Sequence, residues 1–367
     1  MDNTKITIMK SRIEEEIKKI DNKEFTAYFY VIDTKGVASG SLSYIYDIAL
    51  GLKNMGYNVG MMHSEDEFVG VEEWLGKEYA ELPHYNVQKD TIDISPSDLV
   101  FIPEIYSNVM TATRKLPCQK IAILQSFDKM VEFIPFGATW MDFGIYKAIT
   151  TTKANADRLK KYFPQVSTSI ITPKISNVFQ KTKGSKKLMV NIVTNDTSNI
   201  NKIVKPFFWQ YPMYQWVAFR DLNGLSREEF SKALQEAAIT VWVDETTDFG
   251  YSALEAMKCG SIVVGKVPEV APEWMWTKEE EEAGLTNAGI WVENLASLPT
   301  VLASVIRTWT MDEIPESIYK VGSGIASAYT EGNQLKDIKN VIVDDLIAKR
   351  RAEYVTTLET LNNTKKD

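Results

Sequence analysis

Histidine and cysteine are scarce in this chain of 367 residues, and their scarcity excludes several classes of site. The only two histidines, His63 and His84, are isolated in the sequence, too few for a histidine-based metal cage within one chain. The two cysteines, Cys118 and Cys259, lie far apart and show no CxxC spacing, so neither a zinc site nor a disulfide framework is indicated. We therefore predict a reducing, cytoplasmic location and a reaction that does not use a catalytic histidine.

Other absences narrow the range of functions. No apolar run reaches about 18 residues, and the amino-terminal segment is too charged for a secretory signal, so we expect no stable membrane insertion. The net charge of −8 is the opposite of what a dedicated nucleic-acid coat protein needs. No D-x-D motif occurs, so we expect no metal and no other cofactor at a diphosphate site.

What is present is typical of a globular protein of about two domains, with 44% apolar and 25% charged residues. Short apolar runs alternate with helical periodicity along the whole chain, which predicts parallel strands joined by crossover helices. A stretch rich in Lys, Gly and Ser interrupts this alternation and is typical of an exposed connection. We predict an amino-terminal domain over 1–175, a linker over 176–187, a second domain over 188–334 and a helical segment over 335–367.

Two junctions between a strand and a helix stand out. The first contains Gly36 and Gly40 in the text GVASG, a weak motif that a plain turn explains equally well.

The second junction is TTDFGYSALEAMKCGSIVVG, which follows the strand AAITVWV. Its loop, with Phe249 and Gly250, lets a ligand approach the backbone, and a helix starting at Tyr251 and Ser252 presents free N–H groups that suit a phosphate. Glu255, one turn into this helix, has a carboxylate that can accept hydrogen bonds from vicinal hydroxyls such as those of a ribose. The alternative is an ordinary strand–helix junction.

The second junction resembles the retaining GT-B glycosyltransferases of the family 4 type, whose second domain carries E-x7-E within EGFGxxxLEAMACGxPVV. The flanking texts RDLNGLSREEFSKALQEAAITVWV, VPEVAPEWM and GIWVENLASLPTVLASVI resemble the same domain. The resemblance implies an α/β GT-B fold, in which two Rossmann-like domains face a central cleft and a carboxy-terminal helix crosses back to the first domain. It also implies metal-independent transfer of a hexosyl or pentosyl group from a nucleotide sugar to an acceptor hydroxyl, with retention of anomeric configuration.

The chain departs from the family at the first signature glutamate. Thr247 stands at that position and Asp248 follows it. Because the family uses this glutamate near the donor sugar, we expect Asp248 to act there from one position away, with Thr247 as the next candidate. The alternatives are an atypical donor sugar, an impaired enzyme, or an Asp248 that only caps the following helix.

The resemblance assigns further residues to the donor. The family binds the diphosphate with a basic pair after the first strand of its second domain, which makes Lys202 and Lys205 the candidates here, while Asn195 stands near the usual arginine. The alternative is that both lysines are solvated. Gly224 and Leu225 resemble the loop that packs on the nucleobase.

In the first domain, the resemblance assigns Gly36 and Gly40 to a glycine-rich loop beside the donor phosphate and sugar. At the end of a later strand, Gln125 and Ser126 stand where many relatives have a histidine, so a histidine role is lost there. Residues 207–219 contain seven aromatics. Packing in the core explains these better than a stacking platform.

Two other functions remain open on the sequence. A phage-type glycosyltransferase that acts on modified DNA bases is one, although the net charge of −8 speaks against it. A non-catalytic protein that binds a nucleotide sugar is the other. The acceptor could be a glycan, a small molecule or a modified DNA base.

Overall fold

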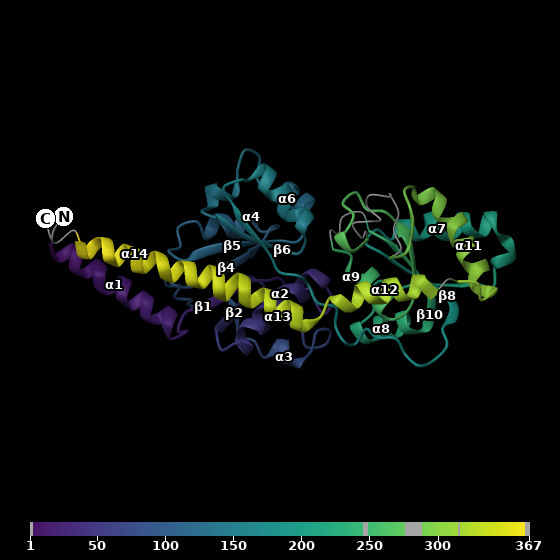
Figure 1. Ribbon diagram of the computed structural model, residues 1–367, viewed down its shortest axis with the longest axis horizontal. Coiled ribbons are helices and arrows are strands. Elements are labelled where there is room, and N and C mark those ends of the chain that lie inside the picture. Colours follow the sequence, from purple (N-terminus) through teal and green to yellow (C-terminus); the bar gives the residue numbers. More distant parts are fainter. Residues whose placement is uncertain (1–2, 245–248, 276–287, 315, 364–367) are drawn as a thin grey trace.

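The computed structural model describes residues 3–244, 249–275, 288–314 and 316–363, which form two α/β domains side by side along the long axis of the molecule (Figure 1). Each domain is built on one parallel sheet with helices on both faces. This confirms the predicted fold class. No helix in the described ranges is long and apolar enough to cross a bilayer.

The amino-terminal sheet has seven parallel strands in the order β3-β2-β1-β4-β5-β6-β7. Its strands are β1 (Thr26–Tyr30), β2 (Asn58–His63), β3 (His84–Asn86), β4 (Leu99–Pro103), β5 (Gln119–Leu124), β6 (Lys147–Thr150) and β7 (Ser167–Ile170). Its helices are α1 (Asn3–Asp21), α2 (Gly40–Asn54), α3 (Lys77–Ala80), α4 (Ser107–Ala112), α5 (Phe127–Phe133), the 3-10 helix η1 (Trp140–Phe143) and α6 (Lys153–Tyr162). The strand order reverses between β1 and β4, and ligands of such sheets bind at that point.

Both faces of this sheet are buried, which explains why its strands are continuous apolar runs. In β1, Phe29 packs into the core shared with α2, whereas Tyr28 and Tyr30 pack into the core on the opposite face. Successive side chains of a strand point to opposite faces, so one strand supplies two cores.

The carboxy-terminal sheet has five parallel strands in the order β12-β11-β10-β8-β9. Its strands are β8 (Lys187–Thr194), β9 (Ala218–Asp221), β10 (Ala237–Val243), β11 (Ile262–Lys266) and β12 (Ile290–Val292). Its helices are α7 (Ser198–Gln210), α8 (Arg227–Glu236), α9 (Tyr251–Lys258), α11 (Leu298–Thr310), α12 (Glu316–Ala328) and the 3-10 helices η2 (Pro212–Tyr214), η3 (Glu273–Met275) and η4 (Leu295–Ser297). The order here reverses between β8 and β10, beside α9.

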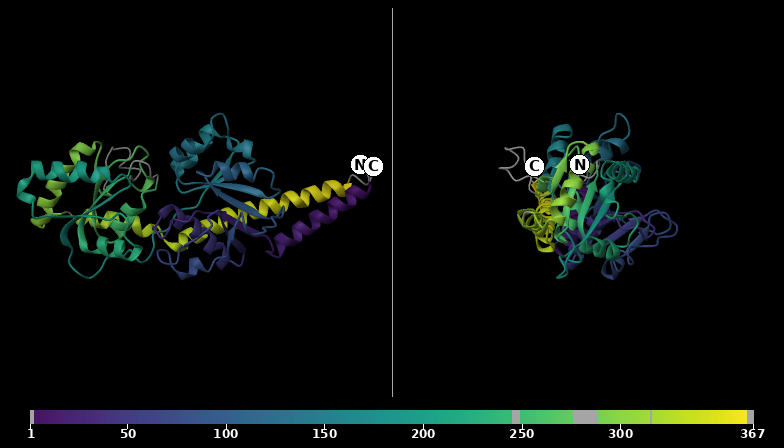
Figure 2. Two further views of the ribbon diagram at one scale, coloured as in Figure 1. Left: turned by 180° about the vertical axis from the view of Figure 1, so that it is seen from behind. Right: turned by 90° about the vertical axis from the view of Figure 1, so that its right-hand side faces the viewer.

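The end of the chain crosses back to the first domain, as the resemblance implied. A continuous helix runs through α13 (Glu331–Ile338), the π-helical η5 (Lys339–Ile347) and α14 (Ala348–Asn363). Ile338 and Ile342 of this helix enter the same core as α2. Figure 2 shows α14 running beside α1, with both chain ends at the tip of this helix pair.

One feature differs from what the sequence predicts. The aromatic segment 207–219 is only partly core: Phe207 is buried, but Trp209 and Trp216 are 76% and 61% exposed. Alternation along α7 and the following turn places some of these rings inside and the others in solvent. The sequence prediction of core packing is therefore wrong for the two tryptophans.

Candidate functional site

A cleft of about 340 Å³ opens between the carboxyl ends of the two sheets and draws its walls from both domains and the linker. Its lining residues are Val37, Ala38, Ser39, Gly40, Ser43, Asp47 and Trp74 from the first domain, Lys174, Ser176 and Phe179 from the connection, and Val193, Asn195, Leu222, Asn223, Gly224, Leu225, Arg227, Phe230, Tyr251, Ser252 and Glu255 from the second domain. The reversal of strand order in the second sheet lies beside this cleft, where a parallel sheet binds its ligand.

The second-domain wall is shaped by the start of α9. Gly250 precedes this helix with a φ of 73°, and a Cβ there would lie 3.0 Å from Trp274 and 3.2 Å from Trp242. Both the backbone conformation and the space therefore require glycine. Phe249 is buried, and its carbonyl accepts a hydrogen bond of 2.6 Å from the Trp274 indole. These contacts hold the helix start, with Ser252, open toward the cleft.

Glu255 faces the cleft one turn further along α9. Burial raises the pKa of this half-buried carboxyl group to about 7, and the charges of Arg227 and Lys258 only partly oppose the shift. Among the described residues none donates a hydrogen bond to it. Glu255 thus provides a carboxylate that a ligand can approach without displacing a protein partner.

Tyr251 crosses the cleft to the first domain. A Cβ on Gly40, at the start of α2, would lie 3.1 Å from the Tyr251 ring, which also packs 4.6 Å from the Phe249 ring centre. The ring contacts the cores of both domains. Its hydroxyl is buried and finds no hydrogen-bond partner in the described part of the chain. A buried hydroxyl without a partner is unfavourable, so a bound ligand that accepts its hydrogen bond would be stabilised.

The first-domain wall carries a paired carboxylate. Asp47 of α2 accepts a hydrogen bond of 2.8 Å from the Tyr79 hydroxyl and lies 3.1 Å from Lys174 Nζ. Lys174 also lies 3.3 Å from Glu331, the first residue of α13. Burial raises the pKa of the Asp47 carboxyl group, and contacts with Lys174 and Tyr79 partly oppose this shift. Burial by itself would lower the pKa of the Lys174 ammonium, but Asp47 and Glu331 outweigh it and raise that pKa.

The loop after β9 forms another part of the second-domain wall. Gly224 has a φ of 74°, and Asp221 accepts a backbone hydrogen bond of 2.9 Å from Asn223, which fixes the turn. Ser226 then caps α8, whose first residue, Arg227, lies over the Phe179 ring at 5.9 Å. Gly224 and Leu225 thus lie in the cleft beside a cation that the sequence did not single out.

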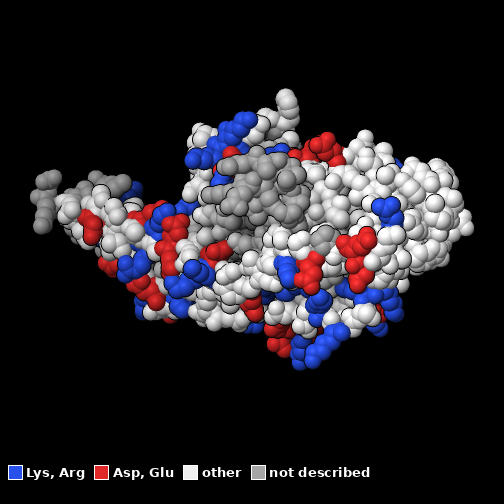
Figure 3. All heavy atoms as spheres, turned by 45° about the vertical axis from the view of Figure 1, so that its right-hand side comes forward, with Lys and Arg blue, Asp and Glu red and all other residues white. Residues whose placement is uncertain are grey.

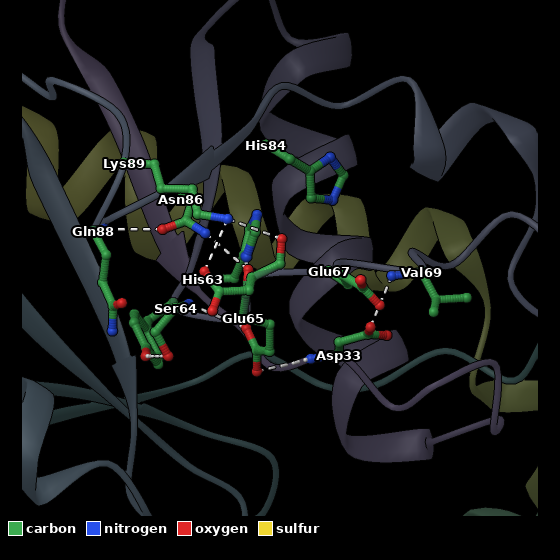
Figure 4. Close-up of polar contacts among 12 residues, drawn as sticks. Asp33, His63, Ser64, Glu65, Glu67, Val69, His84, Asn86, Gln88 and Lys89 are labelled. Carbon is green, nitrogen blue, oxygen red and sulfur yellow. Dashed lines mark hydrogen bonds and ion pairs between the residues drawn. The ribbon is translucent and has the colours of Figure 1, made fainter.

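A polar network fixes the loop after β1, which carries the predicted glycines (Figure 4). Asp33 accepts hydrogen bonds from the backbone of Val69 (2.7 Å) and Lys35 (2.9 Å), and its own N–H donates to Glu65 (3.2 Å). Although burial opposes it, these N–H bonds lower the pKa of Asp33. The loop places Gly40 in the cleft, whereas Gly36, with a φ of 82°, lies outside the lining.

The two histidines lie near this network, on the ring of Phe68. The ring of His63 is 4.3 Å from Phe68, and the ring of His84 is 5.0 Å from it. His84 Nε2 also lies 2.8 Å from the Tyr46 hydroxyl. In the ranges that the structure covers, no three His, Cys, Asp or Glu side chains are grouped to hold a metal.

A second cavity, of about 220 Å³, lies where the strand order of the first sheet reverses and shares Ser39 with the cleft. Its buried carboxyl group is Glu104, just after β4. Burial raises the pKa of Glu104 to about 7, although the backbone N–H groups of Gln125 and Ser126 donate to it at 3.2 and 2.9 Å. Gln125 and Lys129 also line this cavity.

The remaining predicted residues lie elsewhere. Lys202 is exposed on α7, contacts Asn199 (3.2 Å) and Asp196 (3.8 Å), and lies outside the lining of the cleft. Lys205 is exposed one turn further along α7. Thr247 and Asp248 lie outside the described residues, so their predicted roles stay predictions.

The structure thus brings together Gly40, Gly224, Leu225, Tyr251, Ser252 and Glu255, with Phe249 and Gly250 directly behind them. Sequence analysis missed Asp47, Lys174 and Arg227. Only Arg227 had a local signal, because it lies in the text LNGLSREEF that resembles the family. Asp47 and Lys174 are 127 residues apart in the chain and meet only in the folded protein.

Solved structures similar to this chain share its two-domain architecture. They include the pneumococcal O-GlcNAc transferase GtfA in complex with UDP and GlcNAc, with a TM-score of 0.58 and 10% identity over 92% of this chain and 99% of that chain. Sucrose-phosphate synthase from Thermosynechococcus elongatus gives a TM-score of 0.60 and 12% identity over 88% of this chain and 100% of that chain. Anabaena HepE in complex with UDP-glucose gives a TM-score of 0.59 and 11% identity over 87% of this chain and 100% of that chain.

The fold is therefore that of the GT-B glycosyltransferases. No protein-family model and no curated protein matches the sequence.

Proposed function

We propose that this protein is a glycosyltransferase that moves a sugar from a nucleotide-sugar donor to an acceptor hydroxyl, with retention of configuration and without a metal. The observation that carries the proposal is Glu255, a carboxylate with no hydrogen bond from the described residues, at the start of a helix that opens on the interdomain cleft. GtfA and HepE, which share the fold, were solved with UDP and with UDP-glucose.

The donor lies along the second-domain wall in this proposal. Glu255 accepts hydrogen bonds from the ribose hydroxyls, and the loop with Gly224 and Leu225 packs on the nucleobase. The diphosphate lies at the free N–H groups of Tyr251 and Ser252, where the helix dipole favours negative charge.

Cations complete the diphosphate site. Arg227 lines the cleft on that wall, and its charge acts on Glu255. Lys202, with Lys205 in support, stays the candidate pair on α7. Gly40 gives the diphosphate and sugar room on the first-domain side, and Asp248 or Thr247 orients the donor sugar.

The acceptor enters from the first domain, through the cavity with Glu104. An acceptor hydroxyl attacks the anomeric carbon from the face on which the diphosphate leaves. The bond from that carbon to the diphosphate oxygen breaks, the new glycosidic bond forms, and the hydroxyl proton passes to the leaving phosphate oxygen. Cations at the diphosphate then stabilise the charge that develops on it. The two cysteines are free and buried, and the location we propose is cytoplasmic.

A thermal-shift screen with UDP, GDP, ADP, CMP and their sugars tests the proposal. A nucleotide at about 100 times its dissociation constant should add roughly 2.7 kcal/mol to the stability of the folded protein. Release of free sugar or nucleoside diphosphate from the best donor then reports turnover, with and without EDTA, and the anomeric configuration of the product reports retention.

Each outcome has a defined meaning. Binding that Glu255→Gln removes and Glu104→Gln preserves supports the donor site. Binding without turnover of any donor favours a non-catalytic protein. No stabilisation by any nucleotide would reject the proposal.

A further inference from the structure

Two buried carboxylates flank strand β4, one at each end, and their oxygens are used differently. Asp98 directly precedes the strand and Glu104 directly follows it, and both residues are 5% exposed. Asp98 Oδ1 accepts a hydrogen bond from the backbone N–H of Thr26 (2.7 Å), and Oδ2 accepts one from that of Ser95 (2.6 Å). Both oxygens of Asp98 are therefore used within the protein, and they fix the amino end of β4.

Glu104 divides its hydrogen bonds unequally. Its Oε1 accepts from the backbone N–H groups of both Gln125 and Ser126, whereas its Oε2 accepts from no other residue that the structure describes. Burial raises the pKa of both Asp98 and Glu104, so the loss of solvent does not distinguish them, but the unused oxygen does. Glu104 lines the cavity of about 220 Å³, so a ligand hydroxyl there could donate to Oε2.

A second residue of the same cavity has an unpartnered polar atom. Thr34, in the loop after β1, lines the cavity, and its buried hydroxyl finds no hydrogen-bond partner in the described part of the chain. Tyr30 and Tyr106 also line the cavity, with ring centres 5.0 Å apart in an edge-on arrangement. The Tyr30 hydroxyl is already used, because it donates to Ser64 at 3.1 Å. The cavity thus combines two unused polar atoms with the rings of two tyrosines.

This combination fits a sugar ring. Neighbouring hydroxyls of a sugar can donate to Glu104 and bond with Thr34, while its C–H faces pack against aromatic rings. The cavity of about 220 Å³ is smaller than the roughly 300–1,000 Å³ of sites for drug-sized ligands, so it suits one ring rather than a chain. We propose that Glu104 binds a hydroxyl of the acceptor, and that the acceptor presents a single sugar ring to this cavity.

A base turned out of a DNA duplex fits the surroundings less well, because it would bring phosphates to the cavity. Lys129 is the one cation among the described residues that line it, in a chain whose net charge is −8. On the face that Figure 3 draws, the described acidic and basic side chains are mixed and form no continuous basic tract of the kind that follows a phosphate backbone. A neutral sugar ring needs no such tract.

The inference rests on the proposed function, which supplies the donor and the transfer. Ser39 lines both this cavity and the cleft. A sugar ring bound at Glu104 therefore lies next to the cleft in which the donor would bind.

Saturation-transfer NMR with the full chain tests the proposal, using the methyl glycosides of glucose, galactose, mannose and N-acetylglucosamine as probes. We expect at least one probe to bind. In Glu104→Gln the amide oxygen can keep the two backbone hydrogen bonds while an NH2 group replaces Oε2, so affinity for that probe should fall by about tenfold or more. Thr34→Val, which removes only a hydroxyl, should weaken binding by a smaller factor and is a second test that leaves the end of β4 unchanged.

A disaccharide that ends in the same ring separates two sources of the sugar. Tighter binding of the disaccharide than of the methyl glycoside identifies the end of a glycan, and weaker binding identifies a free monosaccharide. Both results support the proposal, provided that Glu104→Gln weakens them.

Asp98→Asn is the matched control, because Asp98 is equally buried at the other end of β4 and both its oxygens are used within the protein. It should lower the melting temperature and leave the affinity for the probe unchanged. The proposal is overturned if no probe binds, if Glu104→Gln binds as tightly as the parent chain, or if Asp98→Asn weakens binding equally. It is also overturned if Glu255→Gln removes sugar binding instead, because the sugar would then lie on the donor wall.

Failure of this inference can be told apart from failure of the proposed function. Stabilisation by a nucleotide without binding of any sugar probe rejects the sugar cavity alone. Sugar binding that depends on Glu104, without stabilisation by any nucleotide, rejects the proposed transfer and leaves the ligand of the cavity as inferred.

Discussion

In the part of the chain that the structure describes, each wall of the cleft carries one carboxylate, and the two carboxylates have different surroundings. Asp47 on the first-domain wall is held by Lys174 and Tyr79, whereas Glu255 on the second-domain wall receives no hydrogen bond from any residue the structure describes. Burial raises the pKa of both groups. Both carboxylates are thus withdrawn from solvent, but Asp47 is paired within the protein, whereas Glu255 is left for a ligand to contact.

The partners of Asp47 belong to the two places where the chain passes between domains. Lys174 lies in the first crossing, and Glu331, which it also contacts, begins the return crossing. The backbone of Ile175 donates to the Tyr329 carbonyl at 2.9 Å, which joins the same two crossings. The first-domain wall is therefore built around the domain connection, and the second-domain wall keeps its carboxylate for a ligand.

Removing the partner of Asp47 should have the largest effect. Lys174→Met leaves a buried carboxylate without its cation and should lower the free energy of unfolding by about 3–5 kcal/mol. Urea denaturation measures the loss. The loss of stability in Lys174→Met should become smaller at low pH. Without its cation, Asp47 has a pKa in the folded state above that in the unfolded state, so it takes up a proton as the pH falls and no longer buries an unpaired charge.

The matched control is Lys320→Met, because Lys320 pairs with Glu316 at 2.6 Å with both side chains exposed. Such a pair contributes about 0–1 kcal/mol. Equal losses from the two substitutions would contradict the structural role of Asp47.

Glu255 should behave in the opposite way. Glu255→Gln should weaken binding of the preferred nucleoside diphosphate by about 1–3 kcal/mol, since ribose hydroxyls lose a charged acceptor, while the melting temperature stays equal or rises. Isothermal titration and a thermal melt on the same sample measure both. An unchanged affinity would show that Glu255 does not bind the donor, and the proposed difference between Glu255 and Asp47 would be wrong.

The pH dependence of nucleotide binding sharpens the contrast further. The pKa of Glu255 is raised to about 7, so its carboxylate form declines as the pH falls below that value. Because the carboxylate is the better acceptor for hydroxyls, affinity should fall by about tenfold from pH 8 to pH 6, and Glu255→Gln should flatten this dependence. A slope that survives in the variant would assign the titration to another group.

Local sequence indicated more of the second-domain wall than of the first-domain wall. The text from Phe249 to Glu255 forms a single junction between a strand and a helix, so its spacing alone indicates the wall that it builds. Asp47 and Lys174 lie far apart in the chain, and no sequence motif predicts their contact. The same limit applies to Trp209, because helical periodicity cannot say which face of α7 meets the sheet.

The smallest predicted effect concerns Gly40, where the two walls touch. Gly40→Ala favours helix α2 by up to about 1 kcal/mol, but the new Cβ would lie 3.1 Å from the Tyr251 ring, closer than ordinary contact. In the parent chain the two contributions should nearly cancel, so urea denaturation should show little change. In a Tyr251→Ala background the crowding is gone, and the same substitution should stabilise the protein. If Gly40→Ala has the same effect in both backgrounds, Tyr251 does not press on Gly40, and the two walls do not meet through this ring in solution.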